Sequence, residues 1–242
     1  MAPTPILLYG ATGRMGRAVR GCLTEFPEVS LRACVARSPD DLGCPKGCAW
    51  MTPEELFAGG RDALPADCVV IDVSLAAGTA RLLDWLERTP RALVSATTGL
   101  GGAEEKRIAA LAARVPVVRA RNLSVGNSVA AAMLRSIPGA ARALFEVDLV
   151  EHHHGAKRDA PSGTALAWAA LLAPGEVRIH SIRSGTVAGI HRVIFAGAGE
   201  TLEVVHTVSD RAVFARGALR AARFLHGQPP GLYTLEQTLA VP

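Results

Sequence analysis

The fold is decided near the start of the chain, by the stretch Ile6–Gly16 (ILLYGATGRMG). Ile6–Tyr9 is a short apolar run typical of a buried strand, and Gly10, Gly13 and Gly16 follow it in the spacing GxxGxxG. Glycines at such a turn permit a tight bend, a close backbone approach to a pyrophosphate and close helix–strand packing. The helix that follows presents free N–H groups to a phosphate. The stretch predicts a dinucleotide site, with a purely steric glycine turn as the alternative.

The rest of the first half alternates strand and helix patterns, which predicts a parallel sheet covered on both faces. After Ile6–Tyr9 the expected strands are Leu31–Ala36, Cys68–Val73, Ala92–Ser95 and Val115–Ala120. The expected helices are Met15–Thr24, Thr79–Glu87 and Ala103–Arg114.

The second half changes character after Asn122–Asn127, a candidate hinge. Strand patterns follow one another with Gly-rich turns between them, which predicts an open mixed or antiparallel sheet. The expected strands are Phe145–Glu151, Val177–Arg183, Gly189–Phe195 and Thr201–Ser209, and the expected helices are Ser128–Ala143, interrupted near Pro138, Ala165–Leu172 and Ala212–Leu225. We therefore expect an α/β fold: a Rossmann-like parallel-sheet nucleotide-binding domain and a smaller α+β domain on an open mixed sheet.

Composition narrows the possible partners. The 242 residues are 49% hydrophobic and 20% charged, as in globular proteins. No apolar run approaches the roughly 18 residues of a membrane span, and the N-terminus lacks the basic region of a signal peptide. We expect no membrane partner and a cytoplasmic location. A net charge of +4 spread along the chain, with 5% aromatic residues, favours a small anionic substrate over nucleic acid.

Five cysteines are present. Cys22, Cys34 and Cys68 fall in helix or strand patterns, where cysteine behaves as a small hydrophobic residue. Cys44 and Cys48 share a loop, but a zinc site would need two further ligands. We expect reduced thiols and no metal.

The residues that follow the second strand bear on the choice of cofactor. An acidic residue there would hold the ribose hydroxyls of NAD and repel a 2′-phosphate. The chain has Ala36-Arg37-Ser38 instead, and Arg37 is suited to pairing with a phosphate. The sequence predicts NADPH as the preferred cofactor and NADH as the alternative, unless Arg37 is simply a solvated arginine.

The stretch Glu151–Thr164 (EHHHGAKRDAPSGT) contains three of the seven histidines and one of the three lysines. We expect it to be a loop between a strand and a helix. Ser162 or a neighbour is suited to cap that helix, whose first N–H groups, at Gly163 and Thr164, form a carboxylate site. Together with His154 and Lys157 nearby, the loop would bind a dianionic acid.

Within the same loop, His153 would donate a proton near neutral pH. Metal binding by the three adjacent histidines is disfavoured, because consecutive residues of an extended chain face opposite sides.

These residues carry a family resemblance over nearly the whole chain. The chain resembles the 4-hydroxy-tetrahydrodipicolinate reductases, formerly called dihydrodipicolinate reductases. The matching motifs are Gly10–Gly16, Ala96–Gly99 (ATTG), Asn122–Gly126 (NLSVG), His153–Ala165, Arg183 with Gly189 and His191, and Phe214–Ala218 (FARGA). Departures from the family pattern occur at Ala36, Asp72–Ser74, Ala96, Arg121 and Asn127–Ser128.

The resemblance implies the NAD(P)H-dependent reduction of 4-hydroxy-tetrahydrodipicolinate to tetrahydrodipicolinate, in the diaminopimelate route to lysine. It implies catalysis by His153 and Lys157 and binding of the small dicarboxylate substrate by His154, Gly163 and Thr164. The implied cofactor residues are Gly10, Ala11, Thr12, Gly13, Arg14 and Met15, with Ala96, Thr97, Thr98, Ala120, Arg121, Asn122 and Leu123 near the nicotinamide.

It also implies a domain organisation and an assembly. Residues 1–122 and 216–242 would form the dinucleotide-binding domain, and residues 123–215 the substrate-binding and oligomerisation domain of a homotetramer. Two rivals remain: a homoserine- or diaminopimelate-type dehydrogenase, and a non-catalytic NADPH-binding sensor.

Overall fold

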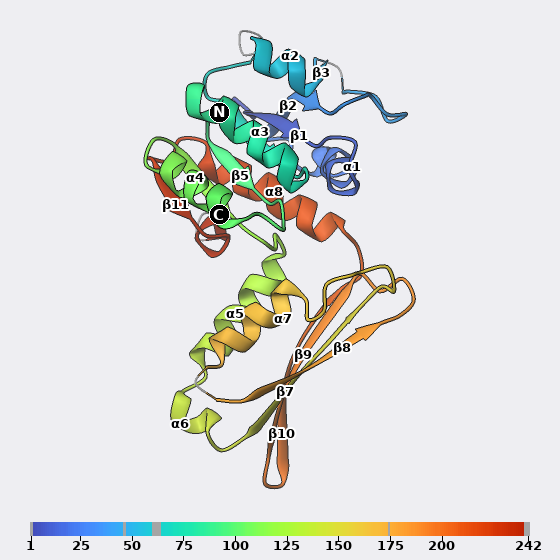
Figure 1. Ribbon diagram of the computed structural model, residues 1–242, viewed down its shortest axis with the longest axis vertical. Coiled ribbons are helices and arrows are strands. Elements are labelled where there is room, and N and C mark those ends of the chain that lie inside the picture. Colours follow the sequence, from blue (N-terminus) through green and yellow to red (C-terminus); the bar gives the residue numbers. More distant parts are fainter. Residues whose placement is uncertain (1, 46, 60–63, 174, 240–242) are drawn as a thin grey trace. The chain divides into compact units, whose positions relative to one another are not determined.

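The computed structural model describes residues 2–45, 47–59, 64–173 and 175–239. The chain divides into two compact units, each with its own β-sheet (Figure 1). Unit 1 comprises Met1–Leu123 and Ala212–Pro242, and unit 2 comprises Ser124–Arg211.

The sheet of unit 1 has seven strands in the order β11-β6-β5-β4-β1-β2-β3, and every neighbouring pair is parallel. The strands are β1 Thr4–Tyr9, β2 Val29–Val35, β3 Ala49–Met51, β4 Val69–Asp72, β5 Leu93–Ser95, β6 Pro116–Arg119 and β11 Gly231–Tyr233. From β1 the chain proceeds to β2 on one side and later to β4 on the other, so the strand order reverses at β1. A ligand site is expected at such a switch point.

Helices cover both faces of this sheet, as the apolar strands predict. They are α1 Arg14–Gly21, α2 Pro53–Ala58, α3 Ala76–Arg88, α4 Gly102–Ala112 and α8 Ala212–Leu225, with short 3-10 helices at Leu23–Glu25 and Glu236–Leu239. Alternate residues of β1 enter different cores. Ile6 and Leu8 pack with α1 and α8, while Leu7 packs with α3 and α4. The doubly covered parallel sheet is confirmed.

Unit 2 contains a mixed sheet of four strands in the order β10-β9-β7-β8. The strands are β7 Glu146–His153, β8 Val177–Arg183, β9 Gly189–Gly197 and β10 Glu200–Val208. The β7–β8 pair is parallel and the other two pairs are antiparallel, which confirms the predicted mixed sheet.

Helices α5 (Val125–Ser136) and α7 (Gly163–Leu171) lie side by side along the sheet of unit 2, and α6 (Gly139–Arg142) follows α5 (Figure 1). Trp168 of α7 and Phe195 of β9 are fully buried in the core between helices and sheet. Residues such as Ile182 and Val205 remain about half exposed. This unit therefore has one packed face and one open face.

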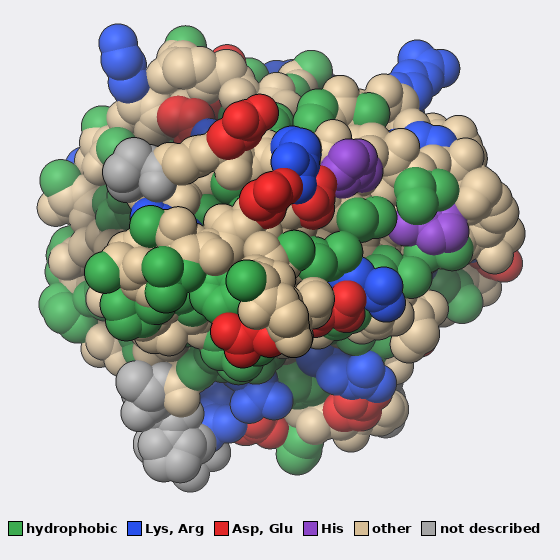
Figure 2. Space-filling view, turned by 90° about the horizontal axis from the view of Figure 1, so that it is seen from below, with side chains coloured by type: hydrophobic (Ala, Val, Ile, Leu, Met, Phe, Trp, Pro, Cys, Tyr) green, Lys and Arg blue, Asp and Glu red, His purple; other side chains and the backbone are tan. Residues whose placement is uncertain are grey.

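Among the described residues, no helix combines the length and the apolar character that a bilayer crossing requires. On the face seen in Figure 2, basic and acidic side chains are interspersed, with no single large basic patch among the residues drawn as described.

Candidate active site

The predicted cofactor residues lie at one edge of the unit 1 sheet. Because all its strands are parallel, their carboxyl ends meet at this edge, where open α/β sheets bind ligands. The loops at this edge carry Gly10–Gly13 after β1, with Arg14 and Met15 opening α1; Arg37 after β2; Ala96–Thr98 after β5; and Ala120–Leu123 after β6. The strand order β6-β5-β4-β1-β2 sets these loops out in a row.

The glycine turn is shaped by contacts that leave no room for side chains. Gly10 has a φ of 89°, and a Cβ there would lie 2.9 Å from the Cα of Ser74. A Cβ at Gly16 would lie 2.3 Å from the carbonyl oxygen of Gly10. Gly13 is the N-cap of α1, has no side-chain cap and is followed by a first turn without acidic residues. This cradle fits a phosphate group, since N–H groups and the positive end of the helix dipole face outward.

Asp72 is a functional candidate that sequence reasoning noted only as a family departure. Its carboxylate is fully buried at the end of β4 and accepts hydrogen bonds from the hydroxyls of Ser74 (2.6 Å) and Thr79 (2.5 Å). Burial raises the pKa of Asp72 above its usual range. Asp72 thereby fixes the loop against which Gly10 packs.

The carboxyl end of β2 is basic at its surface. Ala36 is buried and Arg37 is exposed. The acid nearest in sequence, Asp40, is held by the guanidinium of Arg20 at 2.9 Å and by that of Arg17 at 3.2 Å. The hydrogen bond from Arg20 lowers the pKa of Asp40. The negative charge of Asp40 is therefore already neutralised, while Arg37 faces solvent.

The segment Glu151–Thr164 lies in unit 2 and is not wholly a loop. Its first three residues belong to β7, which ends at His153. Because side chains alternate along a strand, His153 is buried on the packed face, whereas the Nε2 atom of His152 lies on the open face, 2.8 Å from the Oγ atom of Ser184. The histidines are thus divided between two environments.

Glu151 organises the buried side of this segment and is fully buried itself. It accepts hydrogen bonds from the two terminal nitrogens of Arg183 (2.9 and 2.6 Å), from the backbone N–H of Ser162 (3.2 Å) and from Nδ1 of His153. Burial alone would raise the pKa of Glu151, but Arg183, together with Ser181 and His153, lowers it to about 2. Glu151 is therefore a carboxylate at neutral pH.

The contact with Glu151 fixes the tautomer of His153. Nδ1 carries the proton that is donated to the carboxylate, so Nε2 is the nitrogen that gains or loses a proton. A Cβ at Gly189 would lie 3.1 Å from this Nε2, so glycine makes room for the ring. Burial lowers the pKa of His153, and the charge of Glu151 opposes that shift.

The start of α7 completes the cluster. The hydroxyl of Ser162 caps α7 by accepting a hydrogen bond from the N–H of Ala165 at 3.2 Å, and it lies 3.0 Å from Nε2 of His191. The rings of His191 and His153 pack edge to face, with centroids 5.1 Å apart. Gly163 is exposed and Thr164 half-exposed in the first turn.

Lys157 is held by its own loop. Its ammonium group donates to both carboxylate oxygens of Asp159, at 2.7 and 2.8 Å, and its backbone N–H donates to the carbonyl of His154 at 3.1 Å. Lys157 is close enough to His153 for its charge to contribute to lowering the pKa of that ring. His154 is half-exposed at the start of the turn.

The structure therefore brings His153 together with residues to which sequence reasoning gave no catalytic role. The sequence alone predicts only a helix cap at Ser162, and it gives Glu151, Arg183 and His191 no role beyond their motifs. The sequence does contain one sign of this cluster: Glu151 and His153 are two residues apart in a strand pattern, so their side chains lie on the same face.

Ligand atoms of Glu151, His153 and His191 all lie within 4.8 Å of one another, as in a metal site. The hydrogen bonds described above engage each of them: Arg183 and His153 hold Glu151, and the Nε2 atom of His191 faces the hydroxyl of Ser162. The three residues are thus held by hydrogen bonds within the protein.

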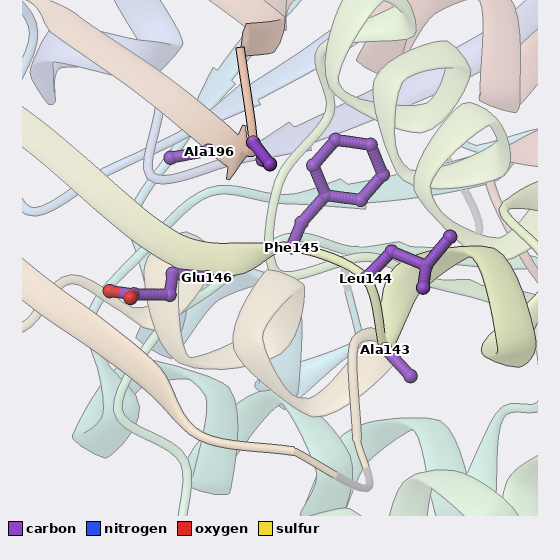
Figure 3. A pocket seen from close by; sticks show the side chains of 7 residues that line it. Ala143, Leu144, Phe145, Glu146 and Ala196 are labelled. Atoms are coloured by element: carbon purple, nitrogen blue, oxygen red, sulfur yellow. The ribbon is translucent and has the colours of Figure 1, made fainter. Parts of the chain in front are cut away.

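Unit 2 also has a surface hollow that lies away from the His153 cluster. Ala143–Glu146 and Ala196–Ala198 line it (Figure 3). Glu146 begins the strand that His153 ends, so the hollow and the histidine lie at opposite ends of β7. Glu146 is the one titratable side chain in its lining, and we assign the hollow no role.

A Rossmann-type sheet with a glycine turn at its switch point, joined to a second unit with a His–Glu–Arg cluster, is the architecture of two-domain nucleotide-dependent oxidoreductases. The family model for the N-terminus of dihydrodipicolinate reductase matches residues 4–123, and the model for its C-terminus matches residues 126–239. The chain belongs to the dihydrodipicolinate reductase family, as the resemblance implied.

Curated relatives and solved structures agree with this membership. The 4-hydroxy-tetrahydrodipicolinate reductase of Stenotrophomonas maltophilia (strain K279a) is 38% identical over 98% of both chains. The enzyme of the same name from Caldanaerobacter subterraneus subsp. tengcongensis is 33% identical over 96% of both. The dipicolinate-bound dihydrodipicolinate reductase of Paenisporosarcina sp. TG-14 has the same fold, with a TM-score of 0.74, 20% identity and coverage of 96% of this chain and 97% of that one.

One of the rival classes shares the fold more distantly. A DAP dehydrogenase from C. glutamicum, in complex with DAP, gives a TM-score of 0.56 at 14% identity, covering 100% of this chain and 97% of that one. The reductase resemblance is thus confirmed at the level of family, and the fold is shared with dehydrogenases.

Proposed function

We propose that the protein reduces 4-hydroxy-tetrahydrodipicolinate to tetrahydrodipicolinate with NAD(P)H, as a step of lysine biosynthesis through diaminopimelate. The observation that carries this proposal is the cluster at the end of β7, where Arg183 holds Glu151 and Glu151 holds Nδ1 of His153, so that Nε2 is the nitrogen placed for proton transfer. The relatives named above bear the reductase's name, and the TG-14 reductase binds dipicolinate, a dicarboxylate.

In this proposal, unit 1 binds the cofactor. The loop Gly10–Met15 holds the pyrophosphate, with the N–H groups of Arg14 and Met15 at the start of α1 as donors. Arg37 pairs with a 2′-phosphate so that NADPH is preferred over NADH, and Ala96–Thr98 with Ala120–Leu123 surround the nicotinamide. The glycine cradle described above supports this placement. Bound NAD(P)H supplies the hydride.

Unit 2 supplies the substrate site. One carboxylate is captured at the N-terminus of α7, by the N–H groups of Gly163 and Thr164 in the first turn that Ser162 caps. His154 and the ammonium group of Lys157 bind the other, with Lys157 exchanging Asp159 for the substrate. Neutralising both carboxylates orients the ring for reduction.

Proton delivery falls to His153. Its imidazolium form would donate from Nε2, and the fixed carboxylate of Glu151 stabilises that form. Lys157 supports the developing charge. Pre-organised general acid catalysis of this kind contributes about 10²-fold or more.

The test is an assay of NADPH and NADH oxidation by the full chain with freshly made 4-hydroxy-tetrahydrodipicolinate. We expect turnover with the wild type and a drop of about 10²-fold in both His153→Gln and Lys157→Gln. His226→Gln changes an exposed histidine of unit 1 and should keep wild-type turnover. Normal turnover in a His153→Gln, Lys157→Gln double variant would refute the assignment.

The same assay separates the rival functions. Cofactor binding without oxidation would favour the non-catalytic sensor, and reduction of NADP⁺ to NADPH by diaminopimelate or homoserine would favour a dehydrogenase. We further propose a cytoplasmic location and a homotetramer, the latter supported by the open face of the unit 2 sheet.

A further inference from the structure

Three thiols meet in unit 1, at the end of β2 and in the connection from β2 to β3 that also carries Arg37. Cys34 lies near the end of β2, and Cys44 and Cys48 lie in the loop that leads to β3. The Sγ atoms of Cys44 and Cys48 are 2.7 Å apart, and those of Cys48 and Cys34 are 3.9 Å apart. All three sulfurs lie within 4.8 Å of one another. The fold thus places Cys34, which the sequence pattern predicts to be a core residue, beside the two loop cysteines.

The separations suit a thiolate metal site. Zinc binds cysteine sulfur at about 2.3 Å, which places the sulfurs of a tetrahedral site about 3.8 Å apart. The pair Cys34–Cys48 is already at that separation, and a shift of about 1 Å between Cys44 and Cys48 brings the second pair to it. The spacing Cys44-x3-Cys48 falls within the range seen for zinc ligands.

The surroundings are compatible with a cation. The nearby guanidinium of Arg20 is neutralised by Asp40 at 2.9 Å, and it stacks over the ring of Trp50 at 5.6 Å, so it adds no unpaired positive charge. Cys34 is buried, whereas Cys44 and Cys48 are half-exposed and open to an incoming ion.

We propose that Cys34, Cys44 and Cys48 bind one thiophilic divalent ion of the zinc class, with water as the fourth ligand. On binding, each thiol loses its proton to solvent and donates a sulfur lone pair to the ion, without any change of oxidation state. The ion would tie the end of β2 to the loop before β3. The site stands apart from the reductase reaction, and its test does not use activity.

The test uses the full chain, reduced, stripped with a chelator and kept free of oxygen. Co²⁺ is titrated while the sulfur-to-cobalt absorption band is followed, and Zn²⁺ is then added to displace it. We expect one ion per chain in the wild type and in Cys68→Ala, which removes a buried cysteine outside the cluster. Cys44→Ser and Cys48→Ser, both at half-exposed positions, should bind at least 100-fold more weakly.

Thermal unfolding gives a second readout. Zn²⁺ at about 100 times its dissociation constant should raise the Tm of the wild type by about 5–10 °C, and should leave the Tm of Cys44→Ser unchanged. The proposal is overturned if the reduced wild type shows no sulfur–cobalt band, or if the band persists at full strength in both serine variants. It is also overturned if Cys44 and Cys48 form a disulfide whose reduction yields no metal binding.

Discussion

Gly189 shows how a residue without a side chain can control the position of one that is proposed to act in catalysis. The position its Cβ would occupy lies 3.1 Å from Nε2 and 3.4 Å from Cδ2 of His153. Gly189→Ala should therefore push the ring of His153 aside and lower kcat by about tenfold, because small displacements of a catalytic group carry large kinetic costs. Steady-state kinetics measure this effect. Gly139→Ala, where the added methyl group meets nothing within 4 Å, is the control.

Arg37 decides the proposed cofactor preference. Arg37→Ala removes an exposed guanidinium suited to a 2′-phosphate, so the KM for NADPH should rise about tenfold while that for NADH changes by less than about twofold. The control is Arg32→Ala, an exposed arginine within β2. Equal changes in the two KM values would contradict the assignment of Arg37.

Glu151 sets the working pH of His153. Its charge opposes the lowering of the pKa of His153 by burial. In Glu151→Gln the imidazolium is less stable, so the pH above which kcat/KM declines should move down by about one unit, corresponding to roughly 1.4 kcal/mol. A purely structural role for Glu151 would lower the rate and leave the profile in place. Glu151→Asp should return the profile towards that of the wild type.

At the scale of elements, β9 and α7 enclose a histidine that the fold keeps neutral. Burial lowers the pKa of His191 to about 3 from its usual value near 6.5. A lowered pKa adds stability above pH 6.5, and that stability is lost as the pH falls towards 3. Once below pH 6.5, the wild type should lose up to about 1.4 kcal/mol of unfolding free energy per pH unit from this group.

The comparison protein for that measurement is His191→Asn, which offers a neutral amide of similar polarity. Its urea unfolding free energy should depend less on pH between 6.5 and 4.5 than that of the wild type. Parallel curves for the two proteins would show that protonation of His191 plays no part.

The elements that sequence patterns predicted are those with long apolar runs. Ile6–Tyr9 became β1 because both faces of its sheet are buried, and the patterns of unit 2 correctly predicted a mixed sheet. The helix expected at Met15–Thr24 is instead α1, ending at Gly21, and a 3-10 turn. Strands β3 and β11 are only three residues long and have no such run. Each is defined by its pairing with a neighbouring strand, which the local sequence does not show.

Sequence patterns also reveal only those parts of the sites that depend on neighbouring residues. Helix α2 was not predicted, although its capping box, in which Thr52 and Glu55 bond each other's backbone N–H groups, is a local pattern. By contrast, the contact between Glu151 and Arg183 depends on the β7–β8 register, and the meeting of Cys34 with the loop cysteines depends on the β2–β3 pair. Local patterns carry no information about such registers, so these partners became visible only with the fold.

At the scale of the whole molecule, the open face of the unit 2 sheet supports the proposed homotetramer. The strand registers align Ile182, His152 and Ile190 in one row and Val205 and Arg192 in the next. Ile182 is 44% exposed and Val205 47% exposed. Apolar side chains gathered on an uncovered sheet are typical of protein interfaces.

Introducing charge on this face should disrupt the assembly. In sedimentation experiments the wild type should have about four times the 25.3 kDa mass of one chain, whereas Ile182→Lys combined with Val205→Lys should give smaller species. Leu144→Lys changes a side chain that is 76% exposed and lies outside these strands, and it should leave the mass unchanged. A monomeric wild type would contradict the proposal.

The return of the chain to unit 1 has a consequence for biosynthesis. Helix α8 supplies Ala215, Leu219 and Leu225 to the core beneath the first strands, and β11 adds the outermost strand beside β6. A growing polypeptide that has emerged only as far as Arg211 carries every residue of unit 2 but still lacks part of the unit that began it. Unit 1 is therefore completed only after unit 2 has been made, and until α8 and β11 emerge its uncovered apolar surface is prone to aggregation.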